Sequence, residues 1–429
     1  LFVMRGGPLG EYELDCLYEV RLSQFLEFLG FGGGAWRGTN IWEFHTPLLY
    51  SLTTLWGHLG EWVGVGDLLL WVRLPNLALS AALMLLFVRI GRHLRLPAVG
   101  WGAALIFGFN PELVFLSSRQ GHYFLEMVAC TWFLERLLAY GEAHRRVHRS
   151  LALAAAISVW AGYLTLLVVI PGMIAALVIA WRRGEGRRGL AAWILALSLV
   201  APVLPRMLET ALMYLQMSGH EPPGLAEQAW LSVYTGHGHF VLPPPTIGRF
   251  FTFFREITTV GVGPAWWLAL GLGGVLLVAR PGWGVLFLGQ LSLFSFVSLL
   301  IYTRMANLTA ALPIVLVAPL WGACHLPGIR ERPRGRVLLC GVLALAFLGA
   351  SFPGVEGRNL RPSKQHGMFQ VSRGASFRSV GAQIHAADLR ELPVVLFARE
   401  PYDRFLICDH VGSRAGIDDC MAALAGGPD

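Results

Sequence analysis

The chain has 429 residues, of which 55% are hydrophobic and only 14% are charged, against roughly 45–50% and about 25% in soluble proteins. So few charged residues cannot cover that much apolar surface in water, which excludes a set of soluble domains, a disordered chain and a collagen-like chain. Six cysteines in this length also exclude a disulfide scaffold. The composition therefore predicts an all-α polytopic transmembrane bundle.

The net charge of +7 comes almost entirely from arginine, because Lys364 is the only lysine. A basic chain can bind nucleic acid, but these arginines occur in short clusters between apolar runs. That placement is typical of cytoplasmic loops in membrane proteins. We therefore expect the chain to contact membrane lipids and not nucleic acid.

Residues 1–69 precede the first predicted span. The chain begins with Leu1 and not with methionine, which leaves room for one further span upstream. The first half of this segment holds an acidic cluster, and residues 46–62 form an amphipathic stretch that carries Trp56 and Trp62. Such a stretch predicts a helix that lies in the membrane interface.

A membrane-spanning helix needs about 20 mainly apolar residues. Candidate spans lie at roughly 70–90, 97–116, 122–140, 150–165, 166–181, 189–207, 261–279, 283–301, 305–322 and 337–351, which gives about 10–11 spans if one more precedes them. The run 150–181 is too long for one span, so we expect a helical hairpin that turns near Gly162–Thr165.

The arginines predict the orientation of these spans. The connections 89–95, 145–149, 182–188 and 330–336 are rich in arginine, whereas the alternating connections contain only Arg119 or Arg304. If the rich connections are cytoplasmic, every span alternates without conflict. Three segments then lie on the extracytoplasmic face, namely residues 1–69, 208–260 and 352–429, and they flank two groups of transmembrane helices at 70–207 and 261–351.

The two later outer segments have features of their own. Residues 246–259 place four phenylalanines beside Arg249 and Arg255, which predicts a second interfacial helix. Residues 352–429 are more polar and contain one helical and two strand-like stretches, which predicts a small α/β appendage. Within it, Cys408 and Cys420 form a disulfide or remain reduced, and the sequence leaves both open.

Four stretches carry motifs in a recurring order. They are EFHTPLLYSLTTLW (43–56), RLPNLALSAALMLLFVRIGRHL (73–94), FNPELVFLSSRQGHYFLEM (109–127) and YTRMANLTAALPIVLVAPL (302–320). Together they resemble the GT-C membrane glycosyltransferases of the protein-O-mannosyltransferase and aminoarabinose-transferase type. The first resembles the His-Pro-Pro-Leu segment of that family, the second its second span, the third its third-to-fourth-span junction and the fourth a late span with Leu-Pro.

The resemblance implies an inverting glycosyltransferase that takes a sugar from a polyprenyl-phosphate donor and passes it to a lipid, glycan or protein acceptor. In the family an acidic residue of the first outer loop acts as the base, in an Asp-Glu pair about thirty residues before the His-Pro-Pro segment. Asp15 stands at that distance before His45, but Cys16 follows it in place of a glutamate. Glu13 and Glu11 precede it and are the other candidate bases.

Transfer also needs cations that stabilise the departing lipid phosphate, and arginine suits this task. The candidates for phosphate binding are the outer-face residues Arg73, Arg304, Arg119 and His122. The candidates for substrate binding are His45, which matches the motif histidine, Glu112 and Arg249. An ion pair with Arg119 would explain Glu112 equally well, and an arginine at the membrane boundary can also simply reach the headgroups.

No cofactor is predicted with certainty. The glycines form no phosphate-binding or dinucleotide fingerprint, which agrees with a lipid-linked donor. His237 and His239 can suggest a metal site, but they have no acidic neighbours and a plain loop explains them better. We assign no metal ligand and leave a divalent metal open as a cofactor.

Two other classes of function stay open. A non-catalytic membrane scaffold with the same architecture would explain the missing acidic partner of Asp15. A transporter or flippase of lipid-linked sugars would also be a multi-pass protein, although no internal repeat is visible. For the enzyme we expect the bacterial cytoplasmic membrane, with the catalytic loops on the periplasmic side.

Overall fold

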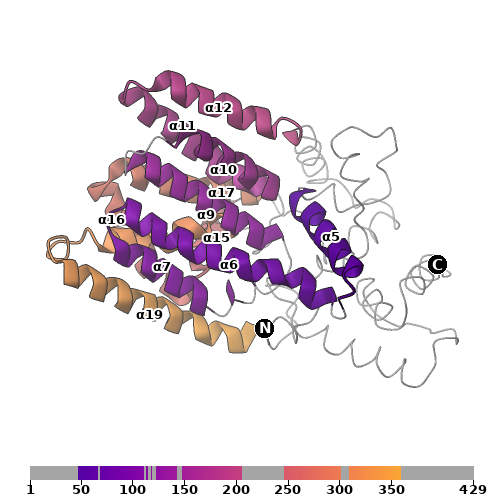
Figure 1. Cartoon of the computed structure of the whole chain (residues 1–429). Coiled ribbons are helices and arrows are strands. Elements are labelled where there is room, and N and C mark those ends of the chain that lie inside the picture. Colours follow the sequence, from indigo (N-terminus) through magenta and orange to yellow (C-terminus); the bar gives the residue numbers. More distant parts are fainter. Residues whose placement is uncertain are drawn as a thin grey trace. The chain divides into compact units, whose positions relative to one another are not determined.

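The protein is described here from a computed structural model, which places residues 47–65, 68–110, 113–114, 117, 122–142, 147–204, 246–300 and 309–358. Helices joined by short turns make up these residues, and no strand occurs among them (Figure 1). The described residues as far as Glu356 belong to one compact unit. The predicted acidic first loop and nearly all of the predicted α/β appendage lie outside this part of the chain.

A helix overlaps each predicted span and each predicted interfacial segment. The helices are α5 (Pro47–Trp62), α6 (Leu68–His93), α7 (Pro97–Phe109), α9 (His122–Gly141), α10 (His148–Ala161), α11 (Leu166–Arg182), α12 (Gly186–Val200), α15 (Ile247–Thr259), α16 (Trp266–Ala279), α17 (Pro281–Leu300), α18 (Leu312–Ala323) and α19 (Pro333–Arg358). Two short 3-10 helices, η1 (Tyr163–Thr165) and η2 (Gly263–Ala265), precede α11 and α16.

Within the part of the chain that the structure describes, four stretches of helix are long and apolar enough to cross a membrane, namely Arg73–His93, Tyr163–Arg182, Pro281–Leu299 and Pro333–Ser351. A fifth results if α15 and α16, which are bent by 116° relative to each other, count as one broken span. The class of a multi-pass protein with apolar helices is thus supported, whereas the larger number of spans stays a prediction.

Helix α7 is shorter than its predicted span, which extended to residue 116. It ends at Phe109, and the following Asn110 has extended backbone angles (φ −71°, ψ 119°). Pro111 comes next, and a proline disfavours helical angles in the residue before it. Helix α19 exceeds its predicted span at both ends, and its earlier start at Pro333 is possible because proline is tolerated in a first turn.

The helices lie side by side in one bundle (Figure 1). Helix α6 packs against α5, α7 and α9; α10 packs against α9 and α12; α16 packs against α17 and α18. The contact of α6 with α7 is a direct approach of two backbones, because a Cβ on Gly100 would lie 2.4 Å from the Phe87 carbonyl oxygen. A Cβ on Gly91 would likewise lie 2.7 Å from the Gly100 nitrogen.

Large apolar side chains cover the outside of this bundle. Exposed examples on α6, α12, α16 and α19 are Leu85, Leu190, Ile194, Trp267, Val278, Leu338 and Leu345. A soluble protein rarely leaves so many large apolar side chains in water. Hydrocarbon chains of lipids would solvate them without penalty, which agrees with a membrane environment.

The arginine-rich connections meet at one end of the bundle, which we call the arginine end. His148, where α10 begins, lies 3.3 Å from the Glu185 carboxylate beyond α11, so α10 and α11 run antiparallel. The predicted hairpin with its turn near Gly162 is therefore confirmed. Arg183 donates to the carbonyl oxygens of Tyr140 and Gly141 at 2.6 Å and so caps the last turn of α9.

The opposite end of the bundle is fixed by Asn110. Its amide nitrogen donates to the Gly261 carbonyl oxygen at 3.2 Å and to the Ser351 hydroxyl at 3.1 Å. These bonds join the end of α7 to the bend between α15 and α16 and to α19. Gly261 adopts a φ of 86° at this bend, a value that favours glycine.

The two predicted interfacial segments are helical, as expected. Helix α5 is anchored to α6 by Trp56 and Trp71, whose rings stack at 4.4 Å and whose indole N–H groups each donate to the carbonyl oxygen of the other residue at 2.8 Å. Trp62 is 83% exposed on α5, and Phe251 is 62% exposed on α15. Both helices thus present apolar side chains outward, which suits an interfacial position.

Candidate functional site

Three of the predicted site residues lie within the described part of the chain: Arg73, His122 and Arg249. The others lie outside it, and their positions stay predictions; these are the candidate bases Asp15, Glu13 and Glu11, the phosphate-binding candidates Arg304 and Arg119, and the substrate-binding candidates His45 and Glu112. His122 is the first residue of α9, so the described structure places its backbone.

Arg73 is completely buried on α6, although it precedes a run of apolar residues. Asn76, one turn later on the same helix, is also buried. A buried guanidinium is costly in an apolar helix and normally faces the bundle interior, where it meets a partner or lines an ion or substrate path. Arg73 thus points inward and does not simply reach lipid headgroups.

Glu126 on α9 is a second charged residue inside the bundle, and the sequence prediction missed it. It is 3% exposed and sits one turn after His122. Its carboxyl group faces the break between α10 and η1, because a Cβ on Gly162 would lie only 1.8 Å from its Oε1 atom. Thr309, three residues before α18 begins, lies near the same carboxyl group, so α9, the helix break and the residues before α18 meet here.

The depth of Arg73 and Glu126 in the bundle can be compared by counting residues along their helices. Helices α6 and α9 pack together, and the ion pair of Arg89 with Glu135 sets a common starting level at the arginine end. Glu126 stands about 13 Å from Glu135 along α9, and Arg73 about 24 Å from Arg89 along α6, at 1.5 Å per residue. Arg73 therefore lies nearer the opposite end than Glu126. The two residues therefore lie at different depths inside the bundle.

Arg249 lies on α15, where its guanidinium carbon is 5.8 Å from the ring centroid of Phe253 one turn later. The Thr246 hydroxyl accepts a hydrogen bond from the Arg249 backbone nitrogen and caps the helix. A cation stacked on a phenylalanine of an amphipathic helix suits the boundary between headgroups and hydrocarbon. Arg249 belongs to a different helix from Arg73.

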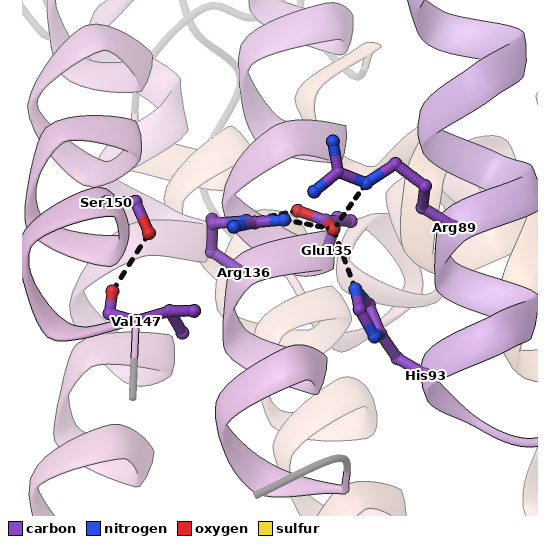
Figure 2. Close-up of polar contacts among 6 residues, drawn as sticks. All are labelled: Arg89, His93, Glu135, Arg136, Val147 and Ser150. Atoms are coloured by element: carbon purple, nitrogen blue, oxygen red, sulfur yellow. Dashed lines mark hydrogen bonds and ion pairs between the residues drawn. The ribbon is translucent and has the colours of Figure 1, made fainter. Parts of the chain in front are cut away.

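A third charged group lies at the arginine end, around the fully buried Glu135 (Figure 2). Its Oε1 atom is 2.7 Å from the His93 Nε2 atom and 3.0 Å from the Arg89 Nε atom, and Arg136 pairs with both carboxylate oxygens. The cluster ties α6 to α9. Both oxygens of the Glu135 carboxylate face cations. We therefore interpret the cluster as a structural ion pair.

The described residues hold no group of three or more histidine, cysteine or acidic side chains that could bind a metal ion. What they do offer is a cation and a carboxylate inside an apolar bundle, on the side away from the arginine connections. A guanidinium at such a place can hold a phosphate or carboxylate group. A buried carboxylate can hold a hydroxyl group or exchange a proton.

Glu126 and Glu135 have a signal in the sequence that could have found them. Both are acidic residues inside an apolar run, HYFLEMVACTWFLERLL, and an ionisable residue within a membrane span is a functional candidate by default.

Comparison with protein-family models, curated proteins and solved structures finds no match. The geometry of the bundle is therefore the ground on which a function can be inferred.

Proposed function

We propose that the chain is an integral membrane glycosyltransferase that moves a sugar from a polyprenyl-phosphate donor to a lipid, glycan or protein acceptor on the extracytoplasmic face. In this proposal about ten helices cross the cytoplasmic membrane of a bacterium. The arginine end faces the cytoplasm, and the transfer proceeds with inversion. A first-loop carboxylate, Asp15 before Glu13 or Glu11, accepts the proton of the acceptor.

One observation carries most of the proposal, and it is the complete burial of Arg73. A lipid-linked donor leaves its phosphate at the boundary of the bilayer, where a cation that faces the bundle interior can pair with it as the sugar–phosphate bond breaks. Arg73 lies toward the end of α6 that is remote from the arginine connections, as an extracytoplasmic site requires. It also opens the Arg-Leu-Pro stretch of the resemblance.

A transporter of lipid-linked sugars is the second candidate, and Glu126 favours it. A buried carboxylate that faces a broken helix is typical of transporters, in which interrupted helices line the substrate path. In this protein the break at Gly162 lies directly against Glu126. In the enzyme, the same carboxylate would hold a hydroxyl group of the sugar or acceptor.

A glycosyltransferase forms a glycosylated product even without a membrane barrier, whereas a transporter of lipid-linked sugars does not. The purified full chain in detergent receives polyprenyl-phosphate sugars and lipid acceptors, and sugar transfer is measured by mass spectrometry. The enzyme transfers sugar, and Asp15→Asn lowers the rate about 100-fold or more. A transporter forms no product in detergent but moves the lipid-linked sugar between leaflets of proteoliposomes.

Arg73→Gln tests the cation, and Arg92→Gln is its matched control, because Arg92 is exposed near the other end of the same helix. We expect Arg73→Gln to lower transfer at least tenfold and Arg92→Gln to leave it unchanged. Unchanged transfer after simultaneous replacement of Asp15, Glu13 and Glu11 would reject the assigned base. Binding to partner proteins with neither transfer nor lipid movement would support the non-catalytic scaffold.

A further inference from the structure

Positive charge gathers at one corner of the arginine end, around the connection between α18 and α19. Four residues form this corner, and we call them the His325 cluster: Arg280, His325, Arg330 and Arg336. Arg280 stands between α16 and α17, His325 and Arg330 lie in the connection itself, and Arg336 is in the first turn of α19. The ring of Trp321 packs 6.5 Å from that of His325 and forms the apolar floor.

Two polar atoms of the cluster are buried without a hydrogen-bond partner among the described residues. They are the Nε atom of Arg336 and the Nε2 atom of His325. Buried polar groups are almost always hydrogen-bonded, and an orphaned one points to a missing water or ion. Because a guanidinium N–H can only donate, the missing partner of Arg336 must be an acceptor.

The surroundings of these two atoms favour an anion over water. Burial and the positive charges of Arg280, Arg330 and Arg336 lower the pKa of His325, and only Glu142 raises it. Glu142 is already engaged, because one carboxylate oxygen accepts from the Trp283 indole at 2.7 Å and the other lies 3.7 Å from Arg280. Among the charged groups that shift this pKa, one carboxylate therefore stands against three arginines.

Two helix ends add to this positive potential. Helix α19 begins at Pro333 without an acidic residue in its first turn, although helix N-termini favour negative charge. Helix α17 begins at Pro281, next to Arg280, and its Trp283 packs 5.9 Å from Trp321. An anion at the His325 cluster would thus face both helix ends and the arginines together.

We propose that the His325 cluster binds a phosphate group. Arg336 and His325 supply the inner donors, while Arg280, which is 48% exposed, and the exposed Arg330 close over the anion from outside. The phosphate can belong to the headgroup of an anionic phospholipid, which basic pockets between membrane helices bind, or to a soluble phosphate. The site is separate from the proposed transfer site at the other end of the bundle.

The test uses the full chain in nanodiscs of phosphatidylcholine. In one arm a fraction of the lipid is replaced by phosphatidylglycerol, and in the other inorganic phosphate is added, with potassium chloride of equal ionic strength as the control. Thermal unfolding and native mass spectrometry measure stabilisation and bound ligand. Stabilisation by phosphatidylglycerol assigns a lipid headgroup, and stabilisation by inorganic phosphate alone assigns a soluble anion.

Variants locate the site. Arg336→Gln removes an inner donor and Arg330→Gln an outer one, and each should weaken binding about tenfold or more. Arg334→Gln is the control, because it removes the same charge from an exposed position of the same helix turn. Arg330 is exposed, so its variant remains informative if Arg336→Gln fails to fold.

The proposal is wrong if neither ligand stabilises the wild type beyond potassium chloride. It is equally wrong if Arg334→Gln weakens binding as much as Arg330→Gln does, since the effect would then reflect general surface charge. Sugar transfer plays no part in these measurements.

Discussion

Gly162 is the position where a single added methyl group should reveal the contact between α9 and the α10–α11 hairpin. In Gly162→Ala the new Cβ would lie 1.8 Å from Oε1, 2.3 Å from Cδ and 2.5 Å from Cγ of Glu126. Gly162 has a φ of −177°, which alanine also adopts. The expected destabilisation therefore comes from overlap with Glu126 and not from backbone strain.

The size of the effect follows from how far Glu126 must move. Ordinary contact between two carbon atoms is about 3.5 Å, so the stem of the side chain has to retreat by about 1 Å and the carboxyl group by more. Because Glu126 is buried, it finds no solvent to swing into. Overpacking of this kind destabilises by about 1–3 kcal/mol.

A double-mutant cycle isolates the contact. Gly162→Ala is made in the wild type and in Glu126→Ala, and the free energy of unfolding is measured in detergent. The alanine at 162 should destabilise the wild type but have little effect when Glu126 is absent, with a coupling energy of about 1–3 kcal/mol. Gly271→Ala on α16 is the control, because nothing lies within 4 Å of its added Cβ. Equal destabilisation in both backgrounds would refute the described contact.

Three further outcomes are expected from the arginine end. Glu135→Gln leaves the partly buried Arg136 and the exposed Arg89 without their counterion and should destabilise by about 1–3 kcal/mol in unfolding experiments, whereas the exposed Glu331→Gln should change little. Arg183→Gln removes the cap of α9 and should lower the free energy of unfolding by about 1–3 kcal/mol. Arg182→Gln, at an exposed position, is the control, and equal destabilisation by the two variants would contradict the cap. The pKa of His325 is lowered in the folded chain, so as the pH falls His325 binds a proton in the unfolded chain before it does so in the folded chain. Stability should therefore decrease with falling pH below about 7, and less so in His325→Gln.

Much of the fold follows from the sequence, because apolar runs of span length fix where the helices lie. The turn at Gly162–Thr165 could be predicted from the length of the run 150–181 alone. Helix ends were harder to predict. Helix α7 ends before Pro111, and α18 begins only at Leu312, because local backbone preferences end a helix sooner than hydropathy suggests.

Some residues of the candidate site could likewise be found from the sequence, and others could not. The sequence singled out Arg73 by its type and its place at the start of a span; the structure buries it completely, and its role in phosphate binding stays a prediction. Glu126 and Glu135 escaped prediction, because hydropathy averages over a window and a single acid in an apolar run disappears in it. What each carboxylate faces depends on residues far away in the chain, Gly162 and Thr309 for one and Arg89 and His93 for the other.

The backbone contact between Gly91 and Gly100 has a consequence for how the protein enters the membrane. Helix α7 has 13 residues and is about 20 Å long, shorter than the hydrocarbon core of about 30 Å. Alone it would be a poor substrate for the insertion machinery. Joined to α6 through the two glycines, it would enter a bilayer as one half of a helical hairpin. A larger residue at Gly100 should therefore separate α7 from α6, because its Cβ would lie 2.4 Å from the Phe87 carbonyl oxygen, and so hinder the joint insertion of the two helices.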